Sequence, residues 1–249
     1  EPEIIIRSLK NLMVMKTVTV FLTQIGRRAR FFLAVLSMVC LGAFSAQGQV
    51  VVDEGFETQC GNPPFAFFEG CFPNWISTHG SPDNQSNFPG VTAAAGQRYM
   101  HGYVKHYYGC SSGPSLTSRG EGVALNYSFQ AGVTYRLKYS HQARRDGGTY
   151  TGQWILTNGL PNQNGSFCSP ADVVPAIPSG SQVVGNASLS SNWVLYTHDF
   201  TPNANFQQLW FRASLIHPTL NAEKHGDYYL DAVSIEIICN PYAGVAAFN

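Results

Sequence analysis

The sequence has 249 residues, and its 15 basic and 15 acidic side chains give a formal net charge of zero. Without an excess of basic residues it has no signature of a nucleic-acid-binding protein. Hydrophobic residues make up 44% and aromatic residues 13% of the chain, a composition that supports a folded core.

Residues 1–48 read as an upstream segment followed by a secretory signal peptide. The chain begins with Glu, and Met13 and Met15 are both possible starts. Three arginines precede an apolar run at residues 31–44, and small residues precede the site after Gly48 where we expect cleavage. A membrane-spanning helix needs about 20 apolar residues, more than this run offers. We therefore expect a secreted or cell-surface protein, not an integral membrane protein.

The part that remains after cleavage has the length of one domain. Residues 1–48 carry six of the basic and two of the acidic residues, which leaves nine basic against 13 acidic, a net charge of −4. We expect a single all-β domain at residues 49–239. Residues 240–249 resemble the start of a linker or of a further domain, so we expect the natural protein to be longer.

Five cysteines remain in this part: Cys60, Cys71, Cys110, Cys168 and Cys239. In an exported protein, cysteines form disulfides more often than metal sites. Cys60 and Cys71 bracket a short Pro-rich loop, and we expect them to pair, at a gain of about 2–3 kcal/mol in stability. Cys110 with Cys168 is a weaker prediction. Because five is odd, one thiol is free or pairs with a chain outside this sequence.

Runs of alternating apolar and polar residues follow one another along the chain, separated by Gly, Asn, Pro and Ser. They lie at 49–57, 97–105, 122–129, 132–142, 152–158, 181–187, 192–200, 207–217 and 226–239. Period two is typical of strands, and no stretch keeps an apolar helical period for ten residues. The pattern predicts an antiparallel sandwich or barrel of eight or nine strands.

The last run contains a carboxylate in an unexpected place. Read with period two, Asp231 lies on the same face as Val233, Ile235 and Ile237, which is the face expected to point inward. A carboxylate in the core costs several kcal/mol unless it is paired or hydrogen-bonded.

Several phrases resemble carbohydrate-binding modules of the CenC-like group. "GFE" near residue 55 and "YYLDAVSIE" near residue 230 resemble the outermost strands of these jelly-roll modules. The order of a W-x-x-x-H-G-[ST]-P loop, a G-E-G strand and a G-x-T-Y strand resembles N-terminal modules of large secreted Bacteroidetes proteins. The loop residues here are Trp75, His79, Gly80, Ser81 and Pro82. The resemblance spans about residues 50–239 and implies an all-β antiparallel sandwich of jelly-roll, galactose-binding-like, type.

The resemblance also implies a structural calcium ion. In such modules the Asp of the last strand and the Glu of the first often share one, which corresponds to Asp231 and Glu57, with Asp53 and a backbone carbonyl as further ligands. The alternative is that Asp231 accepts backbone N–H bonds from a neighbouring loop or pairs with Arg98 or Arg212.

Aromatic residues gather at positions 98–108. Tyr99, His101 and Tyr103 share one face of a predicted strand, and Tyr107 and Tyr108 follow at its end. Exposed aromatic rings stack on the apolar faces of sugars, so Tyr103, Tyr107 and Tyr108 are candidate ligand contacts. The alternative is that these rings pack in the core.

A loop at residues 74–84 and a hairpin tip at 143–148 supply further candidates. His79 and Asp83 are predicted to hydrogen-bond a ligand above the ring of Trp75. The alternative is a loop that closes one end of the sandwich, with Trp75 buried. Arg144, in the hairpin tip, is a candidate contact for an acidic polysaccharide or simply a solvated side chain.

Catalytic motifs are absent from the sequence. It contains no HExxH, no CxxC pair and no G-x-S-x-G elbow. We therefore expect a secreted, non-catalytic glycan-binding or adhesion module of a larger protein. One alternative is a structural module that packs on downstream domains without binding sugar. A polysaccharide lyase, which would use Tyr, His and Arg or Lys around one point, is less favoured.

Overall fold

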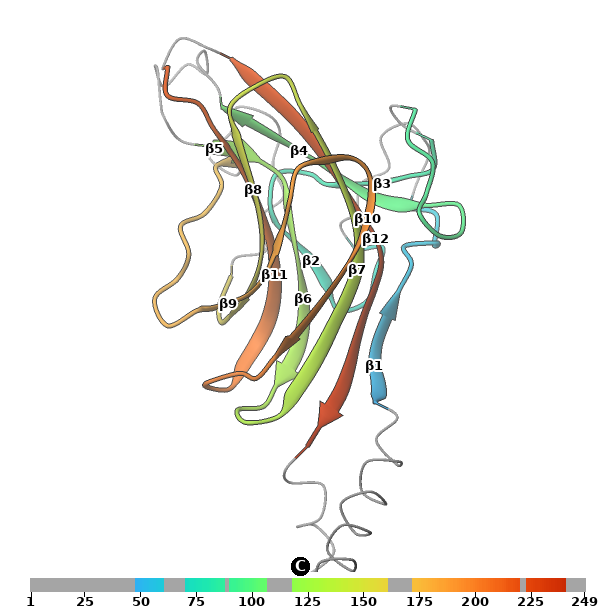
Figure 1. The fold of residues 1–249 in the computed structure, drawn as a ribbon, viewed down its shortest axis with the longest axis vertical. Helices are drawn as coiled ribbons and strands as arrows, with labels where there is room; N and C mark the ends of the chain where they lie inside the picture. Colours follow the sequence, from blue (N-terminus) through green and yellow to red (C-terminus); the bar gives the residue numbers. More distant parts are fainter. Residues whose placement is uncertain are drawn as a thin grey trace, which may run out of the picture. The chain divides into compact units, whose positions relative to one another are not determined.

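The alternating runs form two antiparallel sheets that pack face to face (Figure 1). A computed structural model describes residues 48–60, 70–87, 90–106, 118–160, 172–219 and 223–240. The seven-stranded sheet has the order β10 (Ser190–Phe200), β7 (Thr134–Arg145), β12 (Lys224–Cys239), β4 (Tyr99–His106) and β3 (Asp83–Gln85), with β1 (Gln49–Glu54) along β12 and β5 (Ser118–Gly120) along β4. The five-stranded sheet has the order β2 (Trp75–His79), β6 (Gly122–Phe129), β11 (Phe206–Ile216), β8 (Thr149–Thr157) and β9 (Gln182–Ala187).

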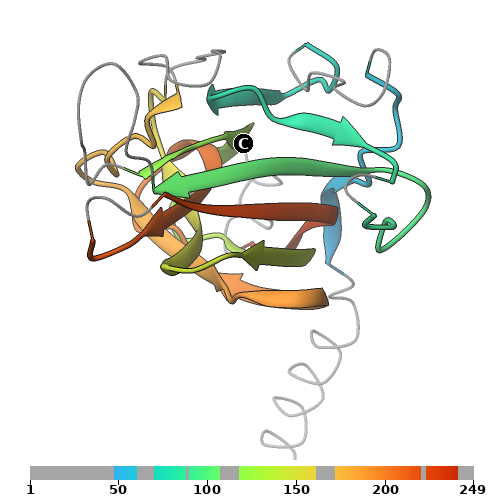
Figure 2. The ribbon, with the colours of Figure 1, turned by 90° about the horizontal axis from the view of Figure 1, so that it is seen from above.

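The chain crosses between the two sheets repeatedly, which gives a sandwich of jelly-roll type. β6 lies in the five-stranded sheet, β7 in the seven-stranded sheet, β8 and β9 in the first again, and β10, β11 and β12 alternate. The predicted fold class is confirmed. Seen from above, β4 and β12 run side by side through the seven-stranded sheet (Figure 2).

The core lies between the sheets, and the predicted inward faces supply it. Val123 and Leu125 of β6 and Leu137 and Tyr139 of β7 are at most 3% exposed and belong to one apolar cluster. Burial of each such side chain contributes about 1.5–3 kcal/mol. The inward-facing apolar residues of these alternating runs therefore supply much of the fold's stability.

Three short strands, β2, β3 and β5, were not predicted. Residues 74–84 were interpreted as a loop, yet Trp75–His79 pairs with β6 and Asp83–Gln85 pairs with β4. Strands of three to five residues carry too little alternation to be recognised, and here their pairing with longer neighbours defines them.

β12 changes phase at Ala232, and this explains the position of Asp231. Its pairing with β7 is regular as far as Asp231, opposite Ser140, and then shifts before Ser234. Ala232 has φ of 49°, the left-handed conformation that a bulge uses. Leu230 and Val233 therefore both enter the core, although they are three positions apart in the sequence. The prediction that Asp231 shares the inward face of Val233 is wrong, because the extra residue interrupts period two.

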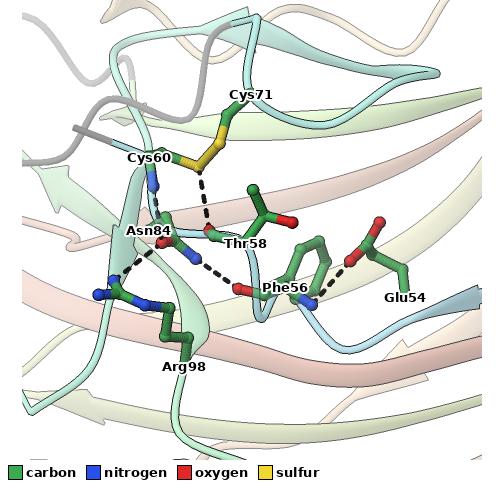
Figure 3. The surroundings of a disulfide bond; sticks show 7 residues. All are labelled: Glu54, Phe56, Thr58, Cys60, Cys71, Asn84 and Arg98. Atoms are coloured by element: carbon green, nitrogen blue, oxygen red, sulfur yellow. Dashed lines mark hydrogen bonds between the residues drawn. A yellow bond between two sulfur atoms is a disulfide. The ribbon is translucent and has the colours of Figure 1, made fainter.

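The disulfide between Cys60 and Cys71 is confirmed (Figure 3). Asn84 supports it from β3: its Oδ1 accepts from the backbone N–H of Cys60 at 3.4 Å, and its Nδ2 donates to the carbonyl of Phe56 at 2.7 Å. The disulfide thus joins the segment after β1 to the segment before β2, and Asn84 ties it to β3 at the edge of the seven-stranded sheet. Among the described residues Cys239 is a free, exposed thiol, while Cys110 and Cys168 lie outside them.

Candidate functional site

The outer face of the seven-stranded sheet carries polar and aromatic side chains in register. Directly paired residues of neighbouring strands point to the same face. Pairing of β3 with β4, β4 with β12 and β12 with β7 aligns a first row, which we call the covered row: Asp83, His101, Tyr229 and Gln142. The next row, which we call the open row, aligns Tyr103, Asp227 and Arg144.

The covered row is almost inaccessible to solvent. Tyr229 is 0% and His101 6% exposed, and their rings stack with centroids 5.2 Å apart. Tyr99 and Trp193 pack edge-on against Tyr229, and the indole N–H of Trp193 donates to the carbonyl of Thr92 at 2.8 Å. The hydroxyl of Tyr229 has no hydrogen-bond partner among the described residues. Four strands thus contribute to one ordered, buried row of polar and aromatic side chains.

The open row reaches solvent. Arg144 is exposed, and Tyr103 and Asp227 are half-buried. Asp227 accepts a hydrogen bond from Nε2 of His101 at 3.1 Å, and Nε2 of His225 lies 3.8 Å from the same carboxylate oxygen. The ring of Tyr103 therefore lies beside a carboxylate held in place by two histidines.

A cation flanks the ring of Tyr103 on its own strand. Nζ of Lys105 lies 5.3 Å from the ring centroid, within the range of a cation–π interaction. The ring of His225 lies on the neighbouring strand with its centroid 6.4 Å away. The open row and these two residues form a surface where one aromatic ring is surrounded by donors and acceptors.

The electrostatics of the face follow from burial and from neighbouring charges. Burial raises the pKa of the Asp83 carboxyl to about 6, against the opposing effect of His101. Although desolvation acts against it, the hydrogen bond from His101, with the charges of His101, His225 and Arg144, lowers the pKa of Asp227. Burial, together with the charges of Glu121 and Asp172, raises the pKa of Tyr103, so its hydroxyl stays protonated.

The structure brings together three of the candidate ligand contacts. Asp83, Tyr103 and Arg144 lie on this one face, Asp83 in the covered row and the other two in the open row. Tyr107 and Tyr108 lie outside the described residues. Their predicted contact with a ligand stays a prediction.

Trp75 and His79 lie in the interior instead of at a ligand surface. Trp75 is 4% exposed and packs edge-on against Phe56, with ring centroids 5.3 Å apart. His79 is 0% exposed, its Nδ1 lies 2.9 Å from Oγ1 of Thr78, and burial lowers its pKa to about 3. The prediction that they contact a ligand is corrected, because their segment is a strand of the five-stranded sheet and not an exposed loop.

The H-G-S and G-E-G motifs have a packing explanation. A Cβ on Gly80 would lie 2.4 Å from the carbonyl of Gly120, and one on Gly122 would lie 2.2 Å from the His79 ring. The buried Glu121 carboxylate accepts hydrogen bonds from the backbone N–H and hydroxyl of Ser81, both at 3.3 Å. The two motifs interlock, so they support the sandwich and not a ligand site.

The predicted calcium ligands hold a loop through hydrogen bonds. Oδ2 of Asp231 accepts from the backbone N–H of Ala94 at 2.8 Å and of Ala95 at 2.9 Å. Both carboxylate oxygens of Glu57 accept from the backbone N–H of Gln97, at 2.9 and 3.1 Å. This arrangement is the alternative left open for Asp231.

A calcium ion at these residues would have to displace the loop from their carboxylates. The oxygens of Asp231 and Glu57 already bind N–H groups, and Asp53 lies exposed on β1, opposite Ser234. Within the described ranges no group of three or more His, Cys, Asp or Glu side chains gathers as a metal site. Calcium therefore stays a prediction, and no part of the function below depends on it.

Sequence reasoning missed three of the seven residues in the two rows. Tyr229 and Gln142 were not identified because they lie on strands distant in sequence. Asp227 was not identified because residues 226–239 were read with one uninterrupted alternation of inward and outward side chains. The shared face of Tyr99, His101 and Tyr103 was the one local signal, and the structure confirms it: all three lie outside the core cluster that holds Met100 and Val104.

Comparisons with known proteins give distant structural similarity. No family model matches the chain, and no curated protein matches it. The xylan-binding CBM22-1 domain of Paenibacillus barcinonensis Xyn10C aligns with 78% of this chain and 97% of its own length, at 12% identity and a TM-score of 0.41. The K1 cleaved adhesin domain of Lys-gingipain from Porphyromonas gingivalis W83 aligns with 75% and 97%, at 14% identity and a TM-score of 0.38. These values are too low to carry a functional conclusion.

One multidomain structure is also similar. The Clostridium thermocellum xylanase 10B CBM22-1–GH10 structure, complexed with xylohexaose, aligns with 78% of this chain and 29% of its own length, at 14% identity and a TM-score of 0.44. Within the described part of this chain, no helix has the length and apolar character needed to cross a membrane.

Proposed function

We propose that this chain is a secreted, non-catalytic glycan-binding module, and that the open row is its binding surface. The observation that carries the proposal is the half-buried ring of Tyr103 beside Lys105 and Asp227, with Arg144 one strand further along the same sheet face. Aromatic rings bind the apolar faces of sugar rings, and the surrounding charged groups hydrogen-bond the hydroxyls. The signal peptide and further domains predicted from the sequence belong to the same proposal.

The covered row, next to the open row on the same face, gives the proposed binding surface an ordered support that suits a rigid polymer. The covered row fixes Asp227 through His101, which itself stacks on the buried Tyr229. A surface built on neighbouring strands pays little entropy when it binds, because its side chains are already ordered. An extended glycan lying across the strands would meet Tyr103 and Arg144 together.

A structural module without a ligand is the competing function. Most of the large aromatic residues are buried, among them Trp154, Trp210 and Tyr99. Arg144 is exposed and makes no ion pair in the described part of the chain, and Tyr103 on the same face is partly exposed. Arg144 therefore has no evident packing role. Arg144 and Tyr103 therefore favour a binding surface over a packing surface.

A polysaccharide lyase is the second candidate, since the face gathers the residue types that such an enzyme needs. Tyr103 and His101 lie on β4 and Arg144 lies on β7, the two strands that flank β12. A lyase needs a base that loses its proton easily, whereas burial raises the pKa of Tyr103 and His101 is bound to Asp227. Incubation with polyuronates would reveal a lyase through the ultraviolet absorbance of the unsaturated product. We expect none.

A glycan panel with paired variants tests the proposed function. We expect wild-type residues 49–240 to bind at least one plant, algal or host glycan. Tyr103→Ala and Arg144→Ala should each weaken binding about tenfold, because each removes a stacking ring or a charged hydrogen-bond donor. Arg145→Ala is the matched control, since Arg145 is the next residue on β7, is also exposed and points to the opposite face.

The result that overturns the proposal is equally clear. No binding to any glycan by the folded wild type, or equal effects of the Arg144 and Arg145 variants, would remove the open row as a sugar site. The structural module would then be the better function, and a product detected with polyuronates would favour the lyase.

A further inference from the structure

A polar hollow lies on the five-stranded sheet, where β2 and β11 begin and β6 ends. Its volume is about 580 Å³, within the range of small-ligand sites. It is lined by Asn74, Asn126, Tyr127, Ser128, Gln207 and Gln208. None of these residues is charged, and four of the six carry side-chain amides. We call this hollow the amide groove.

Hydrogen bonds fix the orientation of the amides at its centre. Oε1 of Gln208 accepts from the backbone N–H of Leu160 at 2.9 Å, so Nε2 is the donor end of that amide. This Nε2 donates to Oδ1 of Asn126 at 3.0 Å. Nδ2 of Asn126 is thereby left as the free end, and it has no hydrogen-bond partner among the described residues.

The other amides add donors and acceptors around this one. Asn74 has φ of 70°, and its carbonyl accepts from the backbone N–H of Asn126 at 2.6 Å, which fixes the rim of the groove. The side chains of Asn74 and Gln207 are exposed, and neither makes a hydrogen bond within the described ranges. The groove therefore presents two amides held in one orientation, those of Gln208 and Asn126, and two exposed amides, those of Asn74 and Gln207, that can adjust to a ligand.

The lining defines the class of ligand. A charged ligand would lose hydration without gaining a counter-charge, so the groove disfavours it. A ligand dense in hydroxyl groups can donate to amide oxygens and accept from amide N–H groups at the same time. A volume of this size accommodates one or two sugar rings.

We propose that the amide groove binds a neutral saccharide unit, as a second glycan contact on the five-stranded sheet. The proposal shares with the proposed function only the premise that the module meets glycans, since the open row lies on the other sheet. Two sites on opposite sheets would let one module bridge two glycan chains, with a gain in avidity that neither site gives alone.

Titration of ¹⁵N-labelled residues 49–240 with neutral xylo-, cello-, manno- and laminari-hexaose tests the inference. At least one of these should shift the side-chain amide signals of Asn126 and Gln207. Asn126→Ala and Gln207→Ala should each weaken that titration about fivefold, the effect of one lost hydrogen bond. Gln207→Ala leaves the Gln208–Asn126 bond intact, so it reports on the groove even if Asn126→Ala disturbs the fold.

Asn186→Ala is the matched control. Asn186 is an exposed asparagine on β9 whose Oδ1 likewise accepts from a glutamine amide, that of Gln153 at 3.3 Å. Its substitution should leave the titration unchanged. Tyr103→Ala should weaken binding at the open row about tenfold while the groove signals still shift.

The two proposals fail differently. If no hexaose shifts the Asn126 or Gln207 amides, or if the groove variants bind like the Asn186 control, the groove inference is overturned. If the groove signals shift but Tyr103→Ala binds like the wild type, the inference about the groove is supported and the open row is rejected as a glycan-binding surface.

Discussion

Asp231 connects the last strand to a loop that crosses the outer face of the seven-stranded sheet. Its carboxylate accepts three backbone N–H bonds, from Ala94, Ala95 and Ala232. Asp231→Asn would turn an N–H₂ group toward at least one of these donors. We expect a loss of about 2 kcal/mol in unfolding free energy, measured with urea. Asp53→Asn, at an exposed position, should change it by less than about 0.5 kcal/mol.

The predicted calcium ion gives a separate expectation at the same residues. If calcium replaces the loop N–H groups around Asp231 and Glu57, it raises the melting temperature of the wild type and EDTA reverses the rise. Asp231→Asn should then show no response to calcium. A melting temperature that ignores calcium in both proteins would leave loop binding as the only role of these carboxylates.

The pH dependence of stability follows from buried acids. Burial raises the pKa of Asp83 to about 6 from an ordinary value of 3.8. Between these two values the folded protein holds a proton that the unfolded chain has released, so stability falls as the pH rises. We expect wild type to lose about 1–3 kcal/mol relative to Asp83→Asn between about pH 4 and pH 6.5, by urea unfolding. A constant difference across that range would contradict the assigned cause.

At the scale of elements, the bulge in β12 decides what each half of the strand does. Before it, Asp227 and Tyr229 face outward on the seven-stranded sheet; after it, Val233 and Ile235 enter the core. A strand with strict period two would place one of these sets on the wrong side.

Substitution of Ala232 tests the bulge. A non-glycine residue at φ of 49° is strained by about 1–2 kcal/mol, and glycine relieves this at some cost in unfolded-state entropy. Ala232→Gly should therefore raise the unfolding free energy by about 0.5–1 kcal/mol. Ala143→Gly, in a buried part of β7 that pairs regularly with β12, should lower it. Equal losses in both variants would show that Ala232 is not strained.

At the scale of the whole molecule, the two sheets share a core but offer different outer faces. The seven-stranded sheet presents charged and aromatic side chains in the open row, and the five-stranded sheet presents neutral amides in the amide groove. Because the core is separate from both, the binding variants above should leave the melting temperature within a few degrees of wild type. A large drop would mean that the residue supports the fold instead.

The sequence by itself determined the features that depend on near neighbours. Alternation over seven or more residues predicted the long strands and their inward faces, such as Val123 and Leu125, since burial follows a local period. The short spacing of Cys60 and Cys71 predicted their disulfide. Only the tertiary structure decided the phase change at Ala232 and the short strands β2, β3 and β5, because pairing with other strands stabilises them.

The candidate site depended almost wholly on tertiary structure. Asp83, His101, Tyr229 and Gln142 are up to 146 residues apart in sequence, and only cross-strand register brings them into one row. The same register separates Arg144 from Arg145 and places Tyr103 beside Asp227. Trp75 and His79 had the residue types of a sugar site, but the pairing of their strand with β6 buried them. Residue type is written in the sequence, whereas exposure is a property of the packed sheets.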